Sequence, residues 1–360
     1  MNSTTSYQPE DRRRQGILNH ASGVWSAANR YAVVLVLLIG LFVFFSFTQD
    51  NFFSKQNVEN LLTSVSILWV VSIGMTFVVL TAGIDLSVGS LLALTGIILS
   101  KLFNDVGLPA PLAVLAAIAI AALIGAGVNG VLIGRVGLSF FVVTLGTLSI
   151  YAGIVSLWSH TQTQYVTSSF IDSIGFGEFL GIPTPIWIMA ATYLIAFVVL
   201  RWTYFGRDVY AVGGNIEAAR LSGINVARTL MIVYGIAGLG AGIAGVIQVG
   251  RLGAASPMVG ADIPLNAAAA VLLGGTSFLG GVGGVSGTAV GVLFIGTLQN
   301  GLAIAGVQSF WQQVVTGVIL IVAIAIDRLQ QGSNLWPRKE MATAPTDGPP
   351  APGAAGASGA

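Results

Sequence analysis

The carboxylate of Asp85 lies in the sequence Thr81-Ala-Gly-Ile-Asp-Leu-Ser-Val-Gly-Ser90, between two long apolar segments. A charged side chain at membrane depth costs about 2.5–3.5 kcal/mol even on the mildest insertion scale. A chain keeps such a group where it lines a cavity, caps a broken helix or pairs with another polar group. Gly83 and Gly89 flank the carboxylate and Ser87 follows it, so this segment predicts an interrupted helix beside a functional site.

Two interpretations of Asp85 are open. Its carboxylate could accept hydrogen bonds from the hydroxyl groups of a ligand, or hold a gate. It could instead cap the helix that starts near Leu86, by accepting first-turn N–H groups such as those of Ser87 or Val88. We favour the cap, because a new apolar helical pattern begins directly after the carboxylate.

The composition is that of a helical membrane protein. The chain is 54% hydrophobic and 8% charged, with a mean hydropathy of +0.85, whereas soluble domains contain about 25% charged residues. A net charge of +1 gives no reason to expect nucleic-acid binding, and the lack of cysteine excludes disulfides and cysteine nucleophiles. The two histidines, His20 and His160, lie far apart and outside the apolar segments, so we expect neither metal nor cofactor in this chain.

Ten apolar segments are long enough to cross or re-enter a membrane. They cover about residues 31–48, 58–81, 86–102, 110–133, 138–158, 184–204, 229–249, 264–279, 285–305 and 310–327. The second and third are nearly continuous, and a Gly-rich turn at 280–284 separates the eighth from the ninth. The predicted fold is therefore an all-α integral membrane protein with about ten transmembrane helices, some of them broken or re-entrant.

The lysines and arginines predict the orientation of the chain. If the N-terminus is cytoplasmic, 12 of the 15 basic residues fall on the cytoplasmic side and Lys55, Lys101 and Arg251 fall outside. Both termini are then cytoplasmic. We divide the chain into an N-terminal tail (1–30), a transmembrane domain (31–328) and a C-terminal tail (329–360) whose Ala/Gly/Pro-rich composition predicts disorder.

Polar or small residues within other apolar segments are candidates for the wall or gate of a solute path. Val271-Leu-Leu-Gly-Gly275 resembles Val79-Leu-Thr-Ala-Gly83, which suggests corresponding interruptions in two halves of the chain. An aromatic ring could complete a site for a small polar solute. For the asparagines, hydrogen bonding between helices is the alternative, and we favour it for either one alone. These candidates are Asn129, Phe140, Thr144, Gly274, Gly275, Thr276 and Asn300.

The longest predicted cytoplasmic loop, about 203–229, contains the pattern of a short helix that ends at a glycine. A polar, exposed helix between two spans can insert into a groove of a partner protein. An ordinary charged loop is the alternative. The residues of this pattern are Gly213, Gly214, Asn215, Glu217, Ala218, Ala219 and Gly223.

Four motifs in order resemble the permease subunit of ribose-type sugar ABC importers. They are Thr81–Ser90, Phe140–Thr147, Gly206–Gly223 and Ala269–Ser277, within a similar region of about 55–328. The resemblance implies a subunit of the bacterial cytoplasmic membrane that passes a monosaccharide or similar small polyhydroxylated solute. The helix at Glu217–Gly223 would be the coupling helix. The chain departs from the family's acidic pattern at Pro264 and Asn266.

The same resemblance implies several partners. A separate ATPase subunit would hold ATP and Mg, an extracytoplasmic binding protein would deliver the solute, and a second permease copy or related subunit would complete the path. Independently, this sequence has no Gly-x-x-x-x-Gly-Lys-Ser/Thr motif, so it is not expected to hydrolyse ATP or to be an enzyme. A secondary transporter or channel is the alternative, although few charged groups are available at membrane depth for coupling ions.

Overall fold

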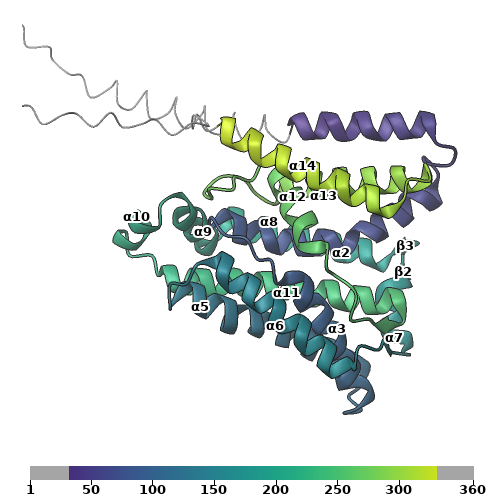
Figure 1. Cartoon of the computed structure of the whole chain (residues 1–360), viewed down its shortest axis with the longest axis horizontal. Helices are drawn as coiled ribbons and strands as arrows, with labels where there is room; N and C mark the ends of the chain where they lie inside the picture. Colours follow the sequence, from purple (N-terminus) through teal and green to yellow (C-terminus); the bar gives the residue numbers. More distant parts are fainter. Residues whose placement is uncertain (1–31, 331–360) are drawn as a thin grey trace, which may run out of the picture.

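The computed structural model describes residues 32–330, except for the side chains of 326–330, and this part is almost entirely helical (Figure 1). The predicted N-terminal tail (1–30) and residues 331–360 of the predicted C-terminal tail lie outside the described residues. The helices are Ala32–Thr48, α2 (Lys55–Leu80), α3 (Val88–Asn104), α4 (Ala110–Ile124), η1 (Gly125–Gly130), α5 (Val131–Gly134), α6 (Phe140–Ser159), α7 (Ser169–Phe176), α8 (Thr184–Trp202), α9 (Tyr204–Gly214), α10 (Ile216–Leu221), α11 (Val226–Leu252), α12 (Ile263–Leu273), α13 (Val285–Ile304) and α14 (Ser309–Gln330). Two short antiparallel ribbons pair β1 (Gln164–Tyr165) with β4 (Ala254–Ala255) and β2 (Glu178–Phe179) with β3 (Ile182–Pro183).

Each of the ten predicted apolar segments corresponds to a helix. By length and composition, six helices of the described chain are able to cross a membrane: Lys55–Leu80, Ala110–Gly134, Phe140–Ser159, Thr184–Trp202, Val226–Leu252 and Val285–Ile304. Four apolar helices are shorter: Ala32–Thr48, Val88–Asn104, Ile263–Leu273 and Ser309–Ala325. The all-α fold with several membrane-spanning helices is confirmed, whereas the crossing of the membrane by all ten stays a prediction.

Two helices, α2 and α11, form the centre of the bundle. Every residue of α2 from Val65 to Leu80 is buried, because this helix is apolar on all sides and is surrounded by other helices. The outer helices α4, α6 and α8 instead expose large apolar side chains such as Leu115, Leu157 and Ile195. Exposed apolar faces of this kind suit contact with lipid tails.

Small residues allow α11 to approach its neighbours closely. A Cβ added at Gly238 would lie 2.5 Å from the carbonyl oxygen of Ala121 on α4, and one at Gly74 of α2 would lie 3.1 Å from Cα of Ala237. The backbones therefore touch without intervening side chains, which is the usual mode of close helix packing in membranes.

The helix contacts repeat in two halves of the chain. Helix α11 packs on α3 and α4, and in the same way α2 packs on α12 and α13. Helix α3 also contacts α4 and α6, and correspondingly α12 contacts α13 and α14. In this pattern α11 takes the place in the second half that α2 takes in the first, as expected for an internal repeat. It relates the interruption after α2 to the one after α11, at 253–262. The correspondence suggested by the similarity of 79–83 to 271–275 is therefore wrong, because those two segments follow helices that play different parts in the pattern.

The starts of α3 and α12 meet inside the bundle. Helix α2 has 26 residues and is about 39 Å long, whereas α12 has 11 residues and is about 16 Å long. A hydrocarbon core is about 30 Å thick, so α12 can cross only part of it. A Cβ added at Gly89 would overlap the carbonyl oxygen of Gly260 and lie 2.9 Å from the ring of Pro264. The starts of α3 and α12 therefore make contact at Gly89.

The contact at Gly89 predicts a strong effect of a side chain there. Gly89→Val places methyl groups against the backbone of Gly260, which cannot rotate away as a side chain can. We expect a loss of about 1–3 kcal/mol or more, seen as a lower melting temperature of the purified protein and poorer expression. Gly40→Val is the matched control, because nothing lies within 4 Å of a Cβ at Gly40. Equal melting temperatures for both variants would contradict the close contact.

Candidate functional site

The carboxylate of Asp85 is buried at the interruption between α2 and α3, with 1% of the residue exposed. Its Oδ1 accepts the backbone N–H of Ser87 at 2.9 Å and the hydroxyl of Ser87 at 2.6 Å. The side-chain amide of Asn129 donates to Oδ2 at 3.2 Å and to the Ser87 hydroxyl oxygen at 2.8 Å. Among the side chains of residues 32–325, no basic group pairs with Asp85, and hydrogen bonds from neutral groups stabilise the carboxylate.

Asp85 is not the N-cap of α3, because no side chain caps the first turn of this helix; of the N–H groups expected of a cap, the carboxylate accepts that of Ser87. Helix α3 begins at Val88 and Ser87 is its N-cap residue, so Asp85 lies two residues before the N-cap. An aspartate that accepts the N–H two residues ahead forms an Asx turn, which prepares the chain to enter a helix. Ala82, with a φ of +61°, and Gly83 complete the reversal after α2.

Asn129 reaches Asp85 from a π-helical turn, η1, which interrupts the helix formed by α4 and α5. Single π turns of this kind are frequent at functional sites. Glycines let η1 pack on α11, since a Cβ at Gly130 would lie 2.7 Å from Cα of Met231. The asparagine is fully buried, and its Oδ1 has no partner in the described chain.

Two tyrosines beside this cluster escaped the sequence analysis. Tyr151 on α6 and Tyr234 on α11 both lie close enough to Asp85 to interact with its charge. Both residues are at most 4% exposed. A Cβ at Gly83 would lie 2.9 Å from the Tyr234 hydroxyl, so the glycine makes room for this ring. A tyrosine in an apolar segment was the available signal, because a buried phenol usually needs a polar neighbour.

The remaining candidates on α6 and α13 do not join the Asp85 cluster through hydrogen bonds. Thr144 is fully buried on α6, which packs on α3, and Phe140 lies partly buried at the start of the same helix. Asn300 and Asn57 exchange two side-chain hydrogen bonds, at 3.1 and 3.2 Å, between α13 and α2. Asn300 therefore makes the interhelical contact that was the favoured alternative.

Gly274, Gly275 and Thr276 begin the loop 274–284 between α12 and α13. This loop contacts the first interruption directly, because the N–H of Gly281 donates to the carbonyl oxygen of Leu80 at 2.9 Å. A Cβ at Gly280 would lie 2.8 Å from both the backbone nitrogen of Ala82 and the carbonyl oxygen of Gly213. The end of α2, the end of α9 and the loop 274–284 thus meet at one place.

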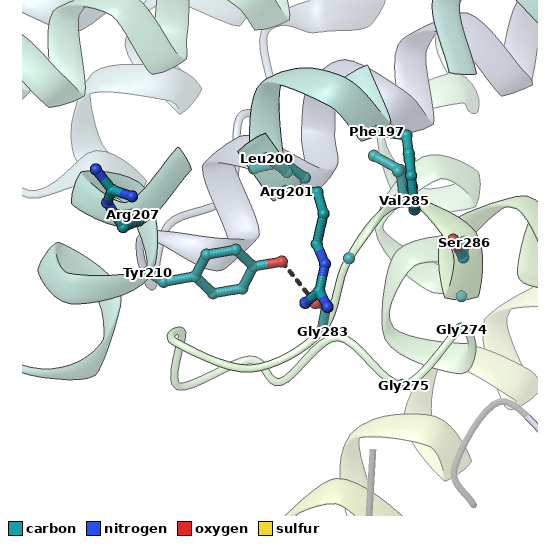
Figure 2. A pocket seen from close by; sticks show the side chains of 12 residues that line it. Phe197, Leu200, Arg201, Arg207, Tyr210, Gly274, Gly275, Gly283, Val285 and Ser286 are labelled. Atoms are coloured by element: carbon teal, nitrogen blue, oxygen red, sulfur yellow. Dashed lines mark hydrogen bonds between the residues drawn. The ribbon is translucent and has the colours of Figure 1, made fainter. Parts of the chain in front are cut away.

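Helix α9 is bonded to this junction. The hydroxyl of Tyr210 donates to the carbonyl oxygen of Gly283 at 2.9 Å, as Figure 2 shows. A Cβ at Gly213 would overlap the carbonyl oxygen of Leu80, so α9 touches both interruptions. Burial raises the pKa of the Tyr210 phenol above its usual value, against the opposing effect of Arg201. The phenol is therefore protonated at neutral pH and remains a donor.

The predicted short helix is confirmed as α10. Asn215 caps it by accepting the N–H groups of Glu217 and Ala218 at 3.0 and 2.9 Å, and Gly223, with a φ of +85°, follows its end. Ala219 faces inward. Figure 1 shows α10 at one extremity of the molecule, where Leu221 is 89% exposed.

Residues 57–324 match the family model described as branched-chain amino acid transport system / permease component. The ribose import permease protein RbsC of Escherichia coli strain K12 is 42% identical over 313 residues, which cover 85% of this chain and 95% of the relative. The chain belongs to the ribose-type permeases of sugar ABC importers. RbsC of Bacillus subtilis strain 168 is 40% identical over 311 residues, covering 86% and 95% of the two chains. The D-allose permease AlsC of Escherichia coli K12 is 36% identical over 301 residues, covering 84% and 92%.

No solved structure matches this permease. Membership of the family confirms a multi-pass transport subunit of the bacterial cytoplasmic membrane that is not an enzyme, and it favours an ABC importer over the secondary transporter or channel. ABC importers of this family imply an ATPase subunit and a binding protein as partners. The permease therefore depends on a separate chain for ATP hydrolysis.

The geometry of Asp85 predicts different effects of two substitutions. Asp85→Ala leaves the Ser87 and Asn129 donors without their acceptor, at about 1–3 kcal/mol for each unsatisfied group. Asp85→Asn retains one oxygen for Ser87, so we expect a smaller fall in melting temperature and largely preserved uptake. Asp105→Ala, in an exposed ion pair with Lys101, is the control and should change stability little. Normal folding of Asp85→Asn with no uptake would mean that transport requires the charge itself.

Proposed function

We propose that this permease forms the membrane path through which an ABC importer takes up a monosaccharide or a similar small polyhydroxylated solute. The relatives named for ribose and D-allose import support this class of substrate. The structural observation that carries the proposal is the continuous contact from α10 through α9 to both helix interruptions. When an exposed helix connects directly to re-entrant segments, a partner that moves this helix can change the side of the membrane from which the solute path is open.

We further propose that the path runs between two permease copies. Asp85, Ser87 and Asn129 are at most 1% exposed, so their cluster is sealed inside one chain. A solute could not reach these residues without a large rearrangement of the bundle. In our proposal the buried cluster does not contact the solute, and it positions the residues that form the gate. The segment from Gly83 to Gly89, the residues Phe140 and Thr144 on α6 and the loop from Gly274 to Thr276 border or position the path.

The distribution of arginines supports the proposed orientation. Arg135, Arg201, Arg207, Arg220 and Arg228 lie on α9, α10 or the adjoining helix ends, here called the α10 end. At the opposite end, marked in Figure 1 by α7, β2 and β3, Arg251 donates to the Thr63 carbonyl, and Lys101 lies near the end of α3. Under the positive-inside rule the α10 end is cytoplasmic. The binding protein would then dock at the α7 end.

In this mechanism α10 inserts into a groove of the ATPase subunit, which holds the ATP and Mg. Ile216 and Leu221 are 43% and 89% exposed, whereas Glu217 pairs with Arg220 at 3.0 Å on the helix surface. Exposed apolar side chains on a cytoplasmic loop provide a contact that a partner can bury. Movement of α10 reaches the gate through the backbone contacts of Gly213 and through Tyr210.

Substitution of Leu221 tests the coupling role. Leu221→Asp, and independently Glu217→Lys, should leave the permease inserted and folded but reduce co-purification of the ATPase and uptake by at least about tenfold, because an interface hot spot contributes about 2 kcal/mol or more. Val136→Asp, also at an exposed apolar residue near the α10 end, is the control. Unchanged co-purification and unchanged solute-stimulated ATP hydrolysis in both variants would count against docking through α10.

Uptake into proteoliposomes tests the substrate class. The permease is reconstituted with its ATPase and binding protein, and uptake of radiolabelled ribose, allose and an amino acid is compared with and without ATP. We expect ATP-dependent uptake of a sugar and none of the amino acid. Uptake without ATP by the permease alone would contradict the ABC mechanism, and amino-acid uptake would contradict the proposed substrate.

A further inference from the structure

A cavity of about 400 Å³ opens at the α10 end, between α8, α9, the loop 274–284 and the first turn of α13 (Figure 2). One wall is apolar and consists of Phe197, Leu200 and Val285. The lining also includes Arg201, Arg207 and Tyr210, and it is completed by glycines of the loop and by Ser286 and Gly287 in the first turn of α13. The cavity adjoins the junction of α9 with the loop. Tyr210, Gly274 and Gly275 line it and take part in the mechanism proposed above, but that mechanism assigns no ligand to the cavity.

The cavity contains positive charge that the described chain does not neutralise. Among the side chains of residues 32–325, no carboxylate forms an ion pair with Arg201 or Arg207, and no hydrogen bond of the Arg201 guanidinium is present. Arg207 stacks on the ring of Tyr204 at 4.2 Å. In Figure 2 the side chain of Arg201 overlaps the Tyr210–Gly283 hydrogen bond in the view, and all three residues line the cavity. A guanidinium with free donors beside a cavity favours an anionic ligand with several oxygens.

Backbone groups add to this preference. Helix α13 has 20 residues and begins beside the cavity, and no side chain caps its first turn. The first N–H groups of a helix lack partners within it and carry the positive end of its dipole. The preceding glycines, Gly283 and Gly284, bring the backbone itself to the cavity surface. The guanidinium of Arg201 and the first N–H groups of α13 together provide hydrogen-bond donors for a phosphate group.

The surroundings of the cavity match the headgroup level of a membrane. Trp202 and Tyr204, which follow Arg201 on the chain, are 70% and 81% exposed. Exposed aromatic rings of this kind gather at the membrane–water interface, and basic pockets between helices on the cytoplasmic side bind anionic headgroups. The apolar wall of Phe197, Leu200 and Val285 would accommodate the glycerol and upper acyl chain.

We propose that this cavity binds a phosphate group, with Arg201 as its main ligand. The phosphate can come from an anionic phospholipid or from a phosphate ester in the cytoplasm, and the aromatic surroundings favour the lipid. The lipid source rests on the proposed cytoplasmic orientation of the α10 end. A bound phosphate would hold Arg201 against the Tyr210–Gly283 contact. It would thereby stiffen the connection between α9 and the gate, and raise the coupling of ATP hydrolysis to transport.

The test uses the complete permease–ATPase complex in nanodiscs of phosphatidylcholine, with or without phosphatidylglycerol. Retained lipid is measured by native mass spectrometry, and ATP hydrolysis is measured with the binding protein and solute. Wild type should retain phosphatidylglycerol and hydrolyse ATP several-fold faster when that lipid is present. Arg201→Gln should lose both the retention and the lipid-dependent increase. Arg135→Gln, an exposed arginine at the same end but outside the cavity, should behave as wild type.

Inorganic phosphate added to phosphatidylcholine nanodiscs distinguishes the two sources. An increase in hydrolysis that requires Arg201, without selective retention of phosphatidylglycerol, would assign the site to a soluble phosphate. Equal lipid retention and equal lipid and phosphate responses in wild type and Arg201→Gln would overturn the proposal. If Arg201→Gln does not fold, Arg207→Gln is judged by the same criteria. Lipid retention is measured without transport, so a failure of uptake in every lipid would contradict the proposed function and leave the binding result intact.

Discussion

An interrupted helix within a membrane exposes backbone N–H and C=O groups that lipid cannot satisfy. After α2 this permease meets that constraint locally, because the N–H groups of Thr81, Ala82 and Gly83 return to carbonyl oxygens of the last helical turn. The Asp85 carboxylate then takes the N–H of Ser87. After α12, Gly275 and Thr276 turn back on their own helix in the same way. Both interruptions therefore retain backbone hydrogen bonds although the regular helix has ended.

A backbone hydrogen bond also joins the interruption after α12 to the interruption after α2. The Gly281 N–H bonds to the carbonyl oxygen of Leu80, and Gly213 of α9 packs against the same oxygen. A movement of α9 cannot leave either interruption unaffected, because glycines at these contacts leave no flexible side chain to absorb it. Close-packed backbones of this kind change between discrete arrangements more readily than they deform continuously. The same small residues thus allow the close packing and, in the proposed mechanism, the switching.

The comparisons separate scaffold from substrate. The family model carries an amino-acid transport description, whereas the relatives reported above import ribose and D-allose. One arrangement of helices can host different solutes when the side chains along the path differ. The Asp85 cluster is sealed and bonded to the backbone, so it belongs to the scaffold that such proteins can share. In the proposed mechanism, the choice of solute then depends on residues that face the path and on the binding protein.

The sequence by itself determined the positions of the ten apolar helices, the interruption at Asp85 and the short helix α10. These features depend on hydropathy, glycine and capping residues within a few positions of one another, so a single chain segment contains all the information. Asn215 and Gly223, for example, mark the ends of α10 without reference to any other helix.

Only the tertiary structure decided which helices are central and which polar residues meet. The most apolar 18-residue stretches of α2 and of the helix Ala110–Gly134 have similar mean hydropathies of 2.1 and 2.4, yet 83% of the residues in the first stretch and 28% of those in the second are buried. Asn129 joins Asp85, whereas Asn300, equally polar and equally within a span, pairs with Asn57. Lipid tails and a protein interior are both apolar, so hydropathy cannot distinguish a helix that faces lipid from one that faces other helices.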